Sequence, residues 1–200
     1  VRWGVRDQYV RNISALTEAL KDRGQSPERV ARMEARLAVL KARWEVWTGQ
    51  PFPRRVEDMR SQDLRNLFDP NLILSDWSRR IVEYKRMLFA VFGEHLPKVE
   101  AMAGKMEQSE AGVDAVIDAV MVEGGYKSVD ELFARFVDLI EKEKMQFVFA
   151  GPTFDYKGRS MVAILDRVLE RLGKNHPLVT QRALYVEGYN DELSHYLVQG

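Results

Sequence analysis

The chain contains no cysteine, and this absence excludes several kinds of chemistry together. Disulfide frameworks, thiolate zinc sites, iron–sulfur clusters and cysteine nucleophiles all need residues that its 200 positions lack. Histidine is scarce, with three copies, and no Gly-x-Ser-x-Gly motif is present, so the sequence gives a Ser-His-Asp triad no support. We therefore predict no catalytic residue, no metal site and no cofactor, and an enzyme is our third hypothesis.

The sequence also lacks long apolar runs. A membrane-spanning helix needs about 18 consecutive apolar residues, and no such run occurs. The opening residues Val1-Arg2-Trp3-Gly4 do not contain the apolar core of a signal peptide. We therefore expect a cytoplasmic protein with no membrane partner. Its 46% hydrophobic and 30% charged residues are the composition of a chain that folds into a packed core.

Net charge is absent as well, but the charges are unevenly placed. Residues 1–99 hold 19 Lys and Arg against 13 Asp and Glu, whereas residues 100–150 hold 5 against 11. A basic half and an acidic segment can complement one another within one molecule or across a head-to-tail contact between copies. Solvated helix faces that differ in charge explain the same pattern without any partner.

The first fifty residues predict an antiparallel helical hairpin. Apolar residues recur at helical spacing between residues 5 and 23, and Gly24 ends that helix. Ser26-Pro27 then begins a second helix, in which Val30, Met33, Leu37, Leu40, Trp44 and Trp47 repeat every three or four residues. So short a turn predicts that the two helices pack along this seam as in a coiled coil.

The proline-containing stretch Thr48–Pro53 predicts the main boundary of the chain. Two prolines within it prevent a helix from continuing. We therefore expect a helical hairpin over residues 1–50 and a helical bundle over residues 51–200. The hairpin either packs on the bundle or extends from it. The alternative is that the chain forms one continuous domain.

The rest of the chain also predicts helices. Trp77, Ile81, Tyr84, Leu88 and Phe92 indicate a buried helix that starts at Ser75 or Asp76 and ends at Pro97. Further helices are expected near residues 98–108, 113–124, 129–140, 161–172 and 191–198. Ser128 to Glu131 fits a capping box, and Gly173 a helix C-cap. Residues 146–150 suit a strand or a helix equally well. The predicted fold class is therefore all-α.

Two motifs resemble ligand sites but depart from the required pattern. The stretch Gly151–Ser160 has six residues between its glycines where a phosphate-binding P-loop has four, and Arg159 stands where the lysine belongs. A loose anion or nucleic-acid phosphate at this helix start, near Lys157, is the remaining reading. Glu192 and His195 have the spacing of one di-iron ligand pair, but the further ligands of such a site are missing.

Arginines follow the proline boundary and recur around Trp77. Arg-rich segments with interleaved aromatic residues are what phosphate contacts and base stacking use. Acidic residues lie among them, which weakens this reading. The candidate nucleic-acid or anion contacts are Arg54, Arg55, Arg79, Arg80, Arg86, Lys157 and Arg159.

Two functional hypotheses follow. The first is a non-enzymatic assembly or interaction protein whose hairpin contacts another copy or a different protein, because two helices alone cannot bury a seam that carries tryptophan. The alternative is a nucleic-acid-binding helical subunit of the capsid or nucleoprotein kind. The residues expected to make contacts, or equally to pack the chain's own core, are Leu16, Leu20, Leu37, Leu40, Trp44 and Trp47.

Overall fold

The computed structural model describes residues 2–72, 74–78, 88–151, 153 and 155–188. Contacts divide the chain into two compact units. The first holds the described residues up to 69 together with 187 and 188, and the second holds those between 70 and 186. The sequence suggested a boundary near residue 50, whereas these units separate between Asp69 and Pro70.

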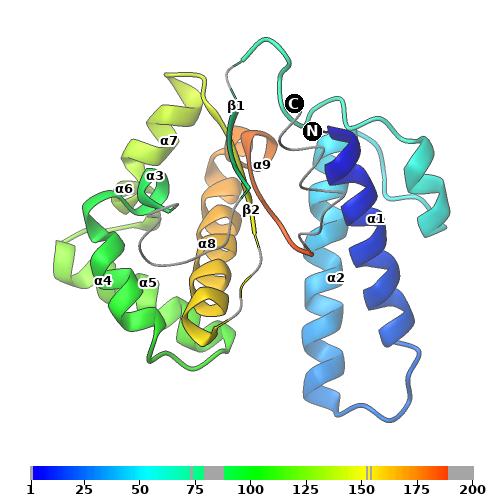
Figure 1. Ribbon diagram of the computed structural model, residues 1–200, viewed down its shortest axis with the longest axis horizontal. Coiled ribbons are helices and arrows are strands. Elements are labelled where there is room, and N and C mark those ends of the chain that lie inside the picture. Colours follow the sequence, from blue (N-terminus) through cyan, green and yellow to red (C-terminus); the bar gives the residue numbers. More distant parts are fainter. Residues whose placement is uncertain (1, 73, 79–87, 152, 154, 189–200) are drawn as a thin grey trace. The chain divides into compact units, whose positions relative to one another are not determined.

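The first unit begins with two long helices, α1 (Arg2–Ala19) and α2 (Pro27–Thr48), which lie side by side (Figure 1). The predicted ends of α2 are confirmed. The Ser26 hydroxyl accepts a hydrogen bond from the Arg29 N–H, Pro27 occupies the first turn, and Gly49 closes the helix with a φ of 65°. A glycine suits that position because left-handed backbone strains residues that carry a Cβ. Helix α1 ends at Ala19, before the predicted Gly24.

The core of the first unit gathers side chains from both helices and from the segment after them. That segment contains a short 3-10 helix, η1 (Val56–Ser61). The buried apolar residues of the first unit are Val5, Tyr9, Val10, Ile13, Leu40, Trp44, Trp47, Met59, Leu64, Leu67 and Phe68. The Arg36 guanidinium lies 2.6 Å from the Glu187 carboxylate, and Asn12 Nδ2 donates to the Glu187 carbonyl. These contacts tie Glu187 to the helices.

The second unit is built on a three-stranded parallel sheet in the order β1-β2-β3. Its strands are β1 (Leu74–Ser78), β2 (Gln146–Ala150) and β3 (Ala183–Val186). Ser78 pairs with Ala150, and Ala150 with Val186, so all three strands end at the same edge. The protein is mostly helical, as predicted, but this small parallel sheet departs from the all-α fold class.

Helices connect the strands and cover one side of the sheet (Figure 1). Between β1 and β2 lie α3 (Phe89–Phe92), η3 (Gly93–His95), α4 (Leu96–Ala103), α5 (Glu110–Gly124), α6 (Val129–Leu132) and α7 (Ala134–Glu141). Between β2 and β3 lie α8 (Tyr156–Asn175) and α9 (Pro177–Arg182). A single core joins these helices to Phe147, Phe149, Ala183 and Tyr185 of the sheet.

Several predicted helices differ from the observed elements. The helix expected from Ser75 or Asp76 is a strand up to Ser78, and residues 79–87 of that prediction lie outside the described chain. Pro97 begins α4 rather than ending a helix. Helix α8 continues past Gly173 to Asn175, so Gly173 is not its C-cap. The helix expected at residues 191–198 lies outside the described residues.

The hydroxyl half of the predicted capping box at Ser128 is present. The Ser128 hydroxyl accepts from the Glu131 N–H at 3.1 Å, which satisfies one orphan donor of the helix. Glu131 Oε2 accepts at 2.7 Å from the N–H of Lys127, one residue before the N-cap, rather than from that of Ser128. The helix is interrupted at Phe133, so α6 and α7 replace the single helix expected there.

Candidate functional site

The six predicted contact residues of α1 and α2 fall into two groups. Leu40, Trp44 and Trp47 are fully buried, each at 1% exposure or less. The remaining three, which lie nearer the turn between the helices, are half-buried: Leu16, Leu20 and Leu37. The seam is therefore closed at one end and partly accessible at the other.

The buried tryptophans are fixed by contacts inside their own unit. Trp44 Nε1 donates to Gln62 Oε1 at 2.6 Å, and the Trp47 ring meets Tyr9 edge-on with centroids 4.6 Å apart. The Asn66 N–H donates to the Trp47 carbonyl at 2.8 Å. These side chains pack the unit's own core.

The predicted basic contacts are distributed over both units. Arg54 and Arg55 are exposed before η1, where Arg55 forms a 2.8 Å ion pair with Asp58. Lys157 and Arg159 lie in the first turn of α8, in the other unit, with Lys157 half-buried and Arg159 exposed. The other three predicted arginines, Arg79, Arg80 and Arg86, lie outside the described residues.

The loop between β2 and α8 does lie at the carboxyl edge of a parallel sheet, which is where phosphate-binding loops occur. The all-α prediction did not anticipate this position. However, Asp155 caps α8, and its carboxylate accepts from the Gly158 N–H at 2.6 Å. A carboxylate at this position satisfies a helix donor and repels a phosphate, so the cap itself argues against an anion site.

The two described histidines have polar partners that the sequence did not reveal. His176 Nδ1 lies 3.0 Å from Glu141 Oε1, and its Nε2 lies 3.5 Å from Asp130 Oδ1. His95 lies beside Tyr126 and lines a pocket. His195 and Glu192 lie outside the described chain. Among the described residues, no group of three or more His, Asp or Glu side chains is arranged to hold a metal ion.

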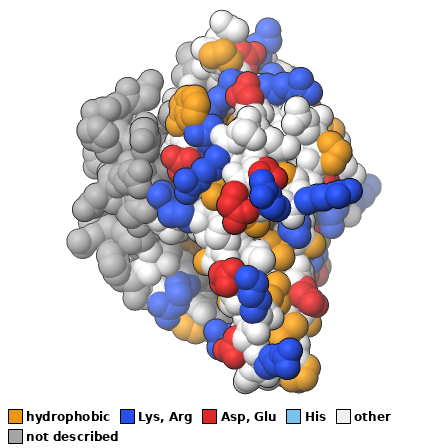
Figure 2. Space-filling model, turned by 90° about the vertical axis from the view of Figure 1, so that its right-hand side faces the viewer, with side chains coloured by type: hydrophobic (Ala, Val, Ile, Leu, Met, Phe, Trp, Pro, Cys, Tyr) orange, Lys and Arg blue, Asp and Glu red, His pale blue; other side chains and the backbone are white. Residues whose placement is uncertain are grey.

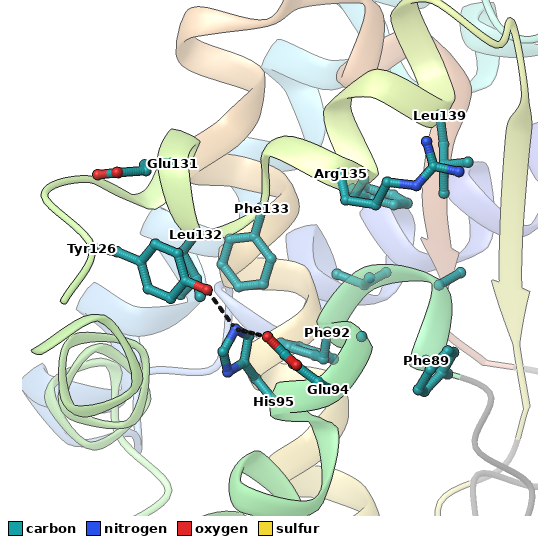
Figure 3. Close-up of a pocket in the computed structure, with 14 residues that line it drawn as sticks. Phe89, Phe92, Glu94, His95, Tyr126, Glu131, Leu132, Phe133, Arg135 and Leu139 are labelled. Carbon is teal, nitrogen blue, oxygen red and sulfur yellow. Dashed lines mark hydrogen bonds and ion pairs between the residues drawn. The ribbon is translucent and has the colours of Figure 1, made fainter. Parts of the chain in front are cut away.

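A pocket of about 560 Å³ opens beside α3 in the second unit. It is formed by α3 and η3, by Tyr126 after α5, and by α6 and α7 (Figure 3). Aromatic rings dominate its walls, and the ring-bearing lining residues are Phe89, Phe92, His95, Tyr126, Phe133 and Phe136. Its charged lining residues are Glu94, Glu131 and Arg135. Apolar walls with a few convergent polar groups are the usual character of a small-molecule site.

Three polar groups converge at one end of this pocket. His95 Nε2 and the Tyr126 hydroxyl are 3.0 Å apart, and Glu94 Oε1 lies 3.9 Å from the same nitrogen (Figure 3). The His95 side chain is 23% exposed, whereas Glu94 is 86% exposed. The His95 ring also meets Tyr126 edge-on at 5.4 Å. This group can accept and donate hydrogen bonds to a ligand whose body rests on the aromatic walls.

Comparisons with known proteins add no relative. No protein-family model, no curated protein and no solved structure matches the chain. Within the part of the chain that the structure describes, no helix combines the length and apolar character that crossing a membrane requires. A functional proposal must therefore rest on the geometry of the chain itself.

Proposed function

We propose that this protein is a non-enzymatic assembly protein whose first two helices, acting as an antiparallel hairpin, contact a second copy of the chain. The burial along the seam carries this proposal. Leu40, Trp44 and Trp47 are closed off inside the first unit, whereas the turn half of the same stripe stays half-buried. An apolar stripe that one unit covers only in part gains stability when another surface completes it.

The distribution of charge supports a second copy as the occupant. Residues 1–69 hold 14 Lys and Arg against 10 Asp and Glu, and residues 100–150 hold 5 against 11. Figure 2 shows many Lys and Arg side chains on the face that carries α1, with Asp and Glu side chains among them and hydrophobic side chains toward the lower end. The acidic segment 100–150 of a second copy has the complementary sign, which a head-to-tail contact can use.

The test compares two double variants on the same helices. Leu16→Asn with Leu37→Asn makes the half-buried stripe polar, whereas Ala15→Asn with Ala38→Asn places the same residues at neighbouring exposed positions. Both pairs change helix propensity in the same direction. By light scattering we expect the unmodified chain and the alanine-site variant to associate and the leucine-site variant to be a monomer. Equal association by all three would contradict the proposal.

The same samples test the nucleic-acid alternative. Phosphate contacts weaken steeply as salt is added, because binding releases condensed counterions. The ratio of ultraviolet absorbance at the nucleic-acid and protein maxima detects nucleic acid that co-purifies with the chain. If this nucleic acid is lost at high salt, the result would favour a role for Arg54 and Arg55 in nucleic-acid binding. Association of nucleic-acid-free protein would favour assembly between copies.

A further inference from the structure

We propose that the pocket beside α3 binds an aryl-alkyl ammonium ion, an organic cation with an aromatic body. This ligand class follows from three features of the pocket: its aromatic rings, the Glu94 carboxylate beside His95, and its volume. The inference concerns the second unit alone and is independent of assembly through α1 and α2.

The rings form walls of the kind that attract cations. Tyr126 stands close to His95 at one end of the pocket, and the exposed Phe89 lies toward the other end (Figure 3). Behind them, Phe92 and Phe133 pack edge-on in the core with centroids 5.7 Å apart and are 2% and 3% exposed. The face of an aromatic ring carries negative partial charge, so ammonium groups bind among several rings. A neutral or anionic ligand does not gain this attraction.

One of the charged lining residues, Glu94, lies beside the converging polar groups. Arg135 forms an ion pair with Glu143, and Glu131, which accepts a hydrogen bond from the Lys127 N–H, points away from His95 (Figure 3). Glu94 lies instead beside His95, at the end where Tyr126 directs its hydroxyl (Figure 3). An ammonium group placed there has Glu94 as its counter-charge and the Tyr126 oxygen as a hydrogen-bond acceptor.

The pocket also has room for an aromatic body. Phe89 lies away from His95 and Tyr126, toward the other end of the pocket (Figure 3), and its side chain is 53% exposed. A volume of about 560 Å³ falls within the range of small-molecule sites. A ligand ring can therefore rest against Phe89 while its ammonium group reaches Glu94.

Calorimetric titration of the whole chain with three probes of similar size tests the ligand class. The probes are 2-phenylethylammonium, 2-phenylethanol and 3-phenylpropanoate, which carry a positive, no and a negative charge. We expect saturable binding of the ammonium ion, with a dissociation constant of about 1 mM or lower and affinity about tenfold above that of the alcohol. Equal binding of all three probes, preference for the anion, or no binding would overturn the proposal.

Two variants at exposed positions identify the site. Glu94→Gln removes the counter-charge, and Phe89→Leu removes a ring while keeping an apolar side chain; each should weaken ammonium binding about fivefold or more. Glu107→Gln, on an exposed residue that is not part of the lining, is the matched control and should bind as the unmodified chain does. Unfolding temperatures show that the variants fold. Unchanged affinity in the folded Glu94→Gln variant would contradict the assignment.

Discussion

Replacing Asp114 by asparagine removes the charge at the centre of an ion-pair network that joins α5 to α8. Arg167 donates to both Asp114 oxygens, from Nε and from Nη2, each at 2.8 Å. Arg171 Nη2 lies 3.1 Å from the same carboxylate. The Asp114 side chain is 25% exposed and the Arg167 side chain 24%, so the pair is shielded from solvent more than an ordinary surface ion pair.

The loss of unfolding free energy expected for Asp114→Asn lies between two known limits. A hydrogen bond to a charged group contributes about 1.5–3 kcal/mol, and an exposed ion pair about 0.2–1 kcal/mol. In the variant Arg167 keeps its contact with Glu170, and Arg171 keeps Asp118 at 3.3 Å, so neither guanidinium is left without a partner. We therefore expect Asp114→Asn to lower the free energy of unfolding by about 1–2 kcal/mol.

Urea unfolding followed by far-ultraviolet circular dichroism measures this difference, and Asp118→Asn is the control. Asp118 is 55% exposed and makes one contact to Arg171 in the same network, so its replacement should cost about 0.5 kcal/mol or less. Both changes remove one negative charge from α5, which makes their effects on net charge equal. The difference between them therefore measures the bidentate pair with Arg167 together with the Asp114–Arg171 contact.

The pH dependence gives the sharper test. Hydrogen bonds from Arg167, together with the charge of Arg171, hold the pKa of Asp114 below its usual value. A carboxyl whose folded pKa is depressed contributes stability above its unfolded pKa, about 3.9, and loses it as the pH falls through the folded pKa. The cost of Asp114→Asn should thus be full near about pH 6 and shrink below about pH 4. A cost independent of pH, or an equal cost for Asp118→Asn, would refute this reasoning.

Two further substitutions test packing in each unit by thermal unfolding. Gly173→Ala places a Cβ 2.4 Å from Thr180 Oγ1, so we expect the free energy of unfolding to fall by about 1–3 kcal/mol. Adding Thr180→Ala should restore this stability in the double variant. An unchanged melting temperature of Gly173→Ala would contradict the close approach of α8 and α9. Trp44→Phe removes the hydrogen bond to Gln62 and should lower the free energy of unfolding by about 1 kcal/mol or more. The control Trp3→Phe changes a residue that is 64% exposed and should lower it little. Equal losses of stability would contradict the burial of Trp44.

Helix ends could be predicted where the signal is local. Ser26, Pro27 and Gly49 bound α2 because capping depends on a hydroxyl, a fixed φ and a tolerated left-handed backbone within a few residues. The Ser128 cap was found for the same reason. Such features need no knowledge of the rest of the chain.

The sheet could not be predicted because its strands are short and carry no alternating pattern. All five residues of β2 and all four of β3 are buried, so apolar and polar positions do not alternate as they do on a half-exposed strand. In β1 the aromatic residue Trp77 matches the spacing of later apolar residues and indicated a helix. Only pairing with distant segments distinguishes these strands from helix.

The pocket was missed because its parts are separate in the sequence. His95 and Glu94 are adjacent in the sequence, but Tyr126 follows a Gly-Gly pair more than one helix later. The six residues predicted on α1 and α2, as contact or packing positions, could not be divided between these two roles from the sequence, because heptad spacing is the same for both. Trp44 and Trp47 share their spacing with Leu37 but are fully buried.

The central claim, assembly through the first two helices, is tested most directly by the mass of the unmodified chain in solution. Light scattering over a range of protein concentrations should give a mass above that of one 23.1 kDa chain, rising with concentration toward a defined oligomer or a filament. A mass that stays at 23.1 kDa at every concentration, in protein free of nucleic acid, would contradict the claim and would mean that the seam serves only the chain's own core.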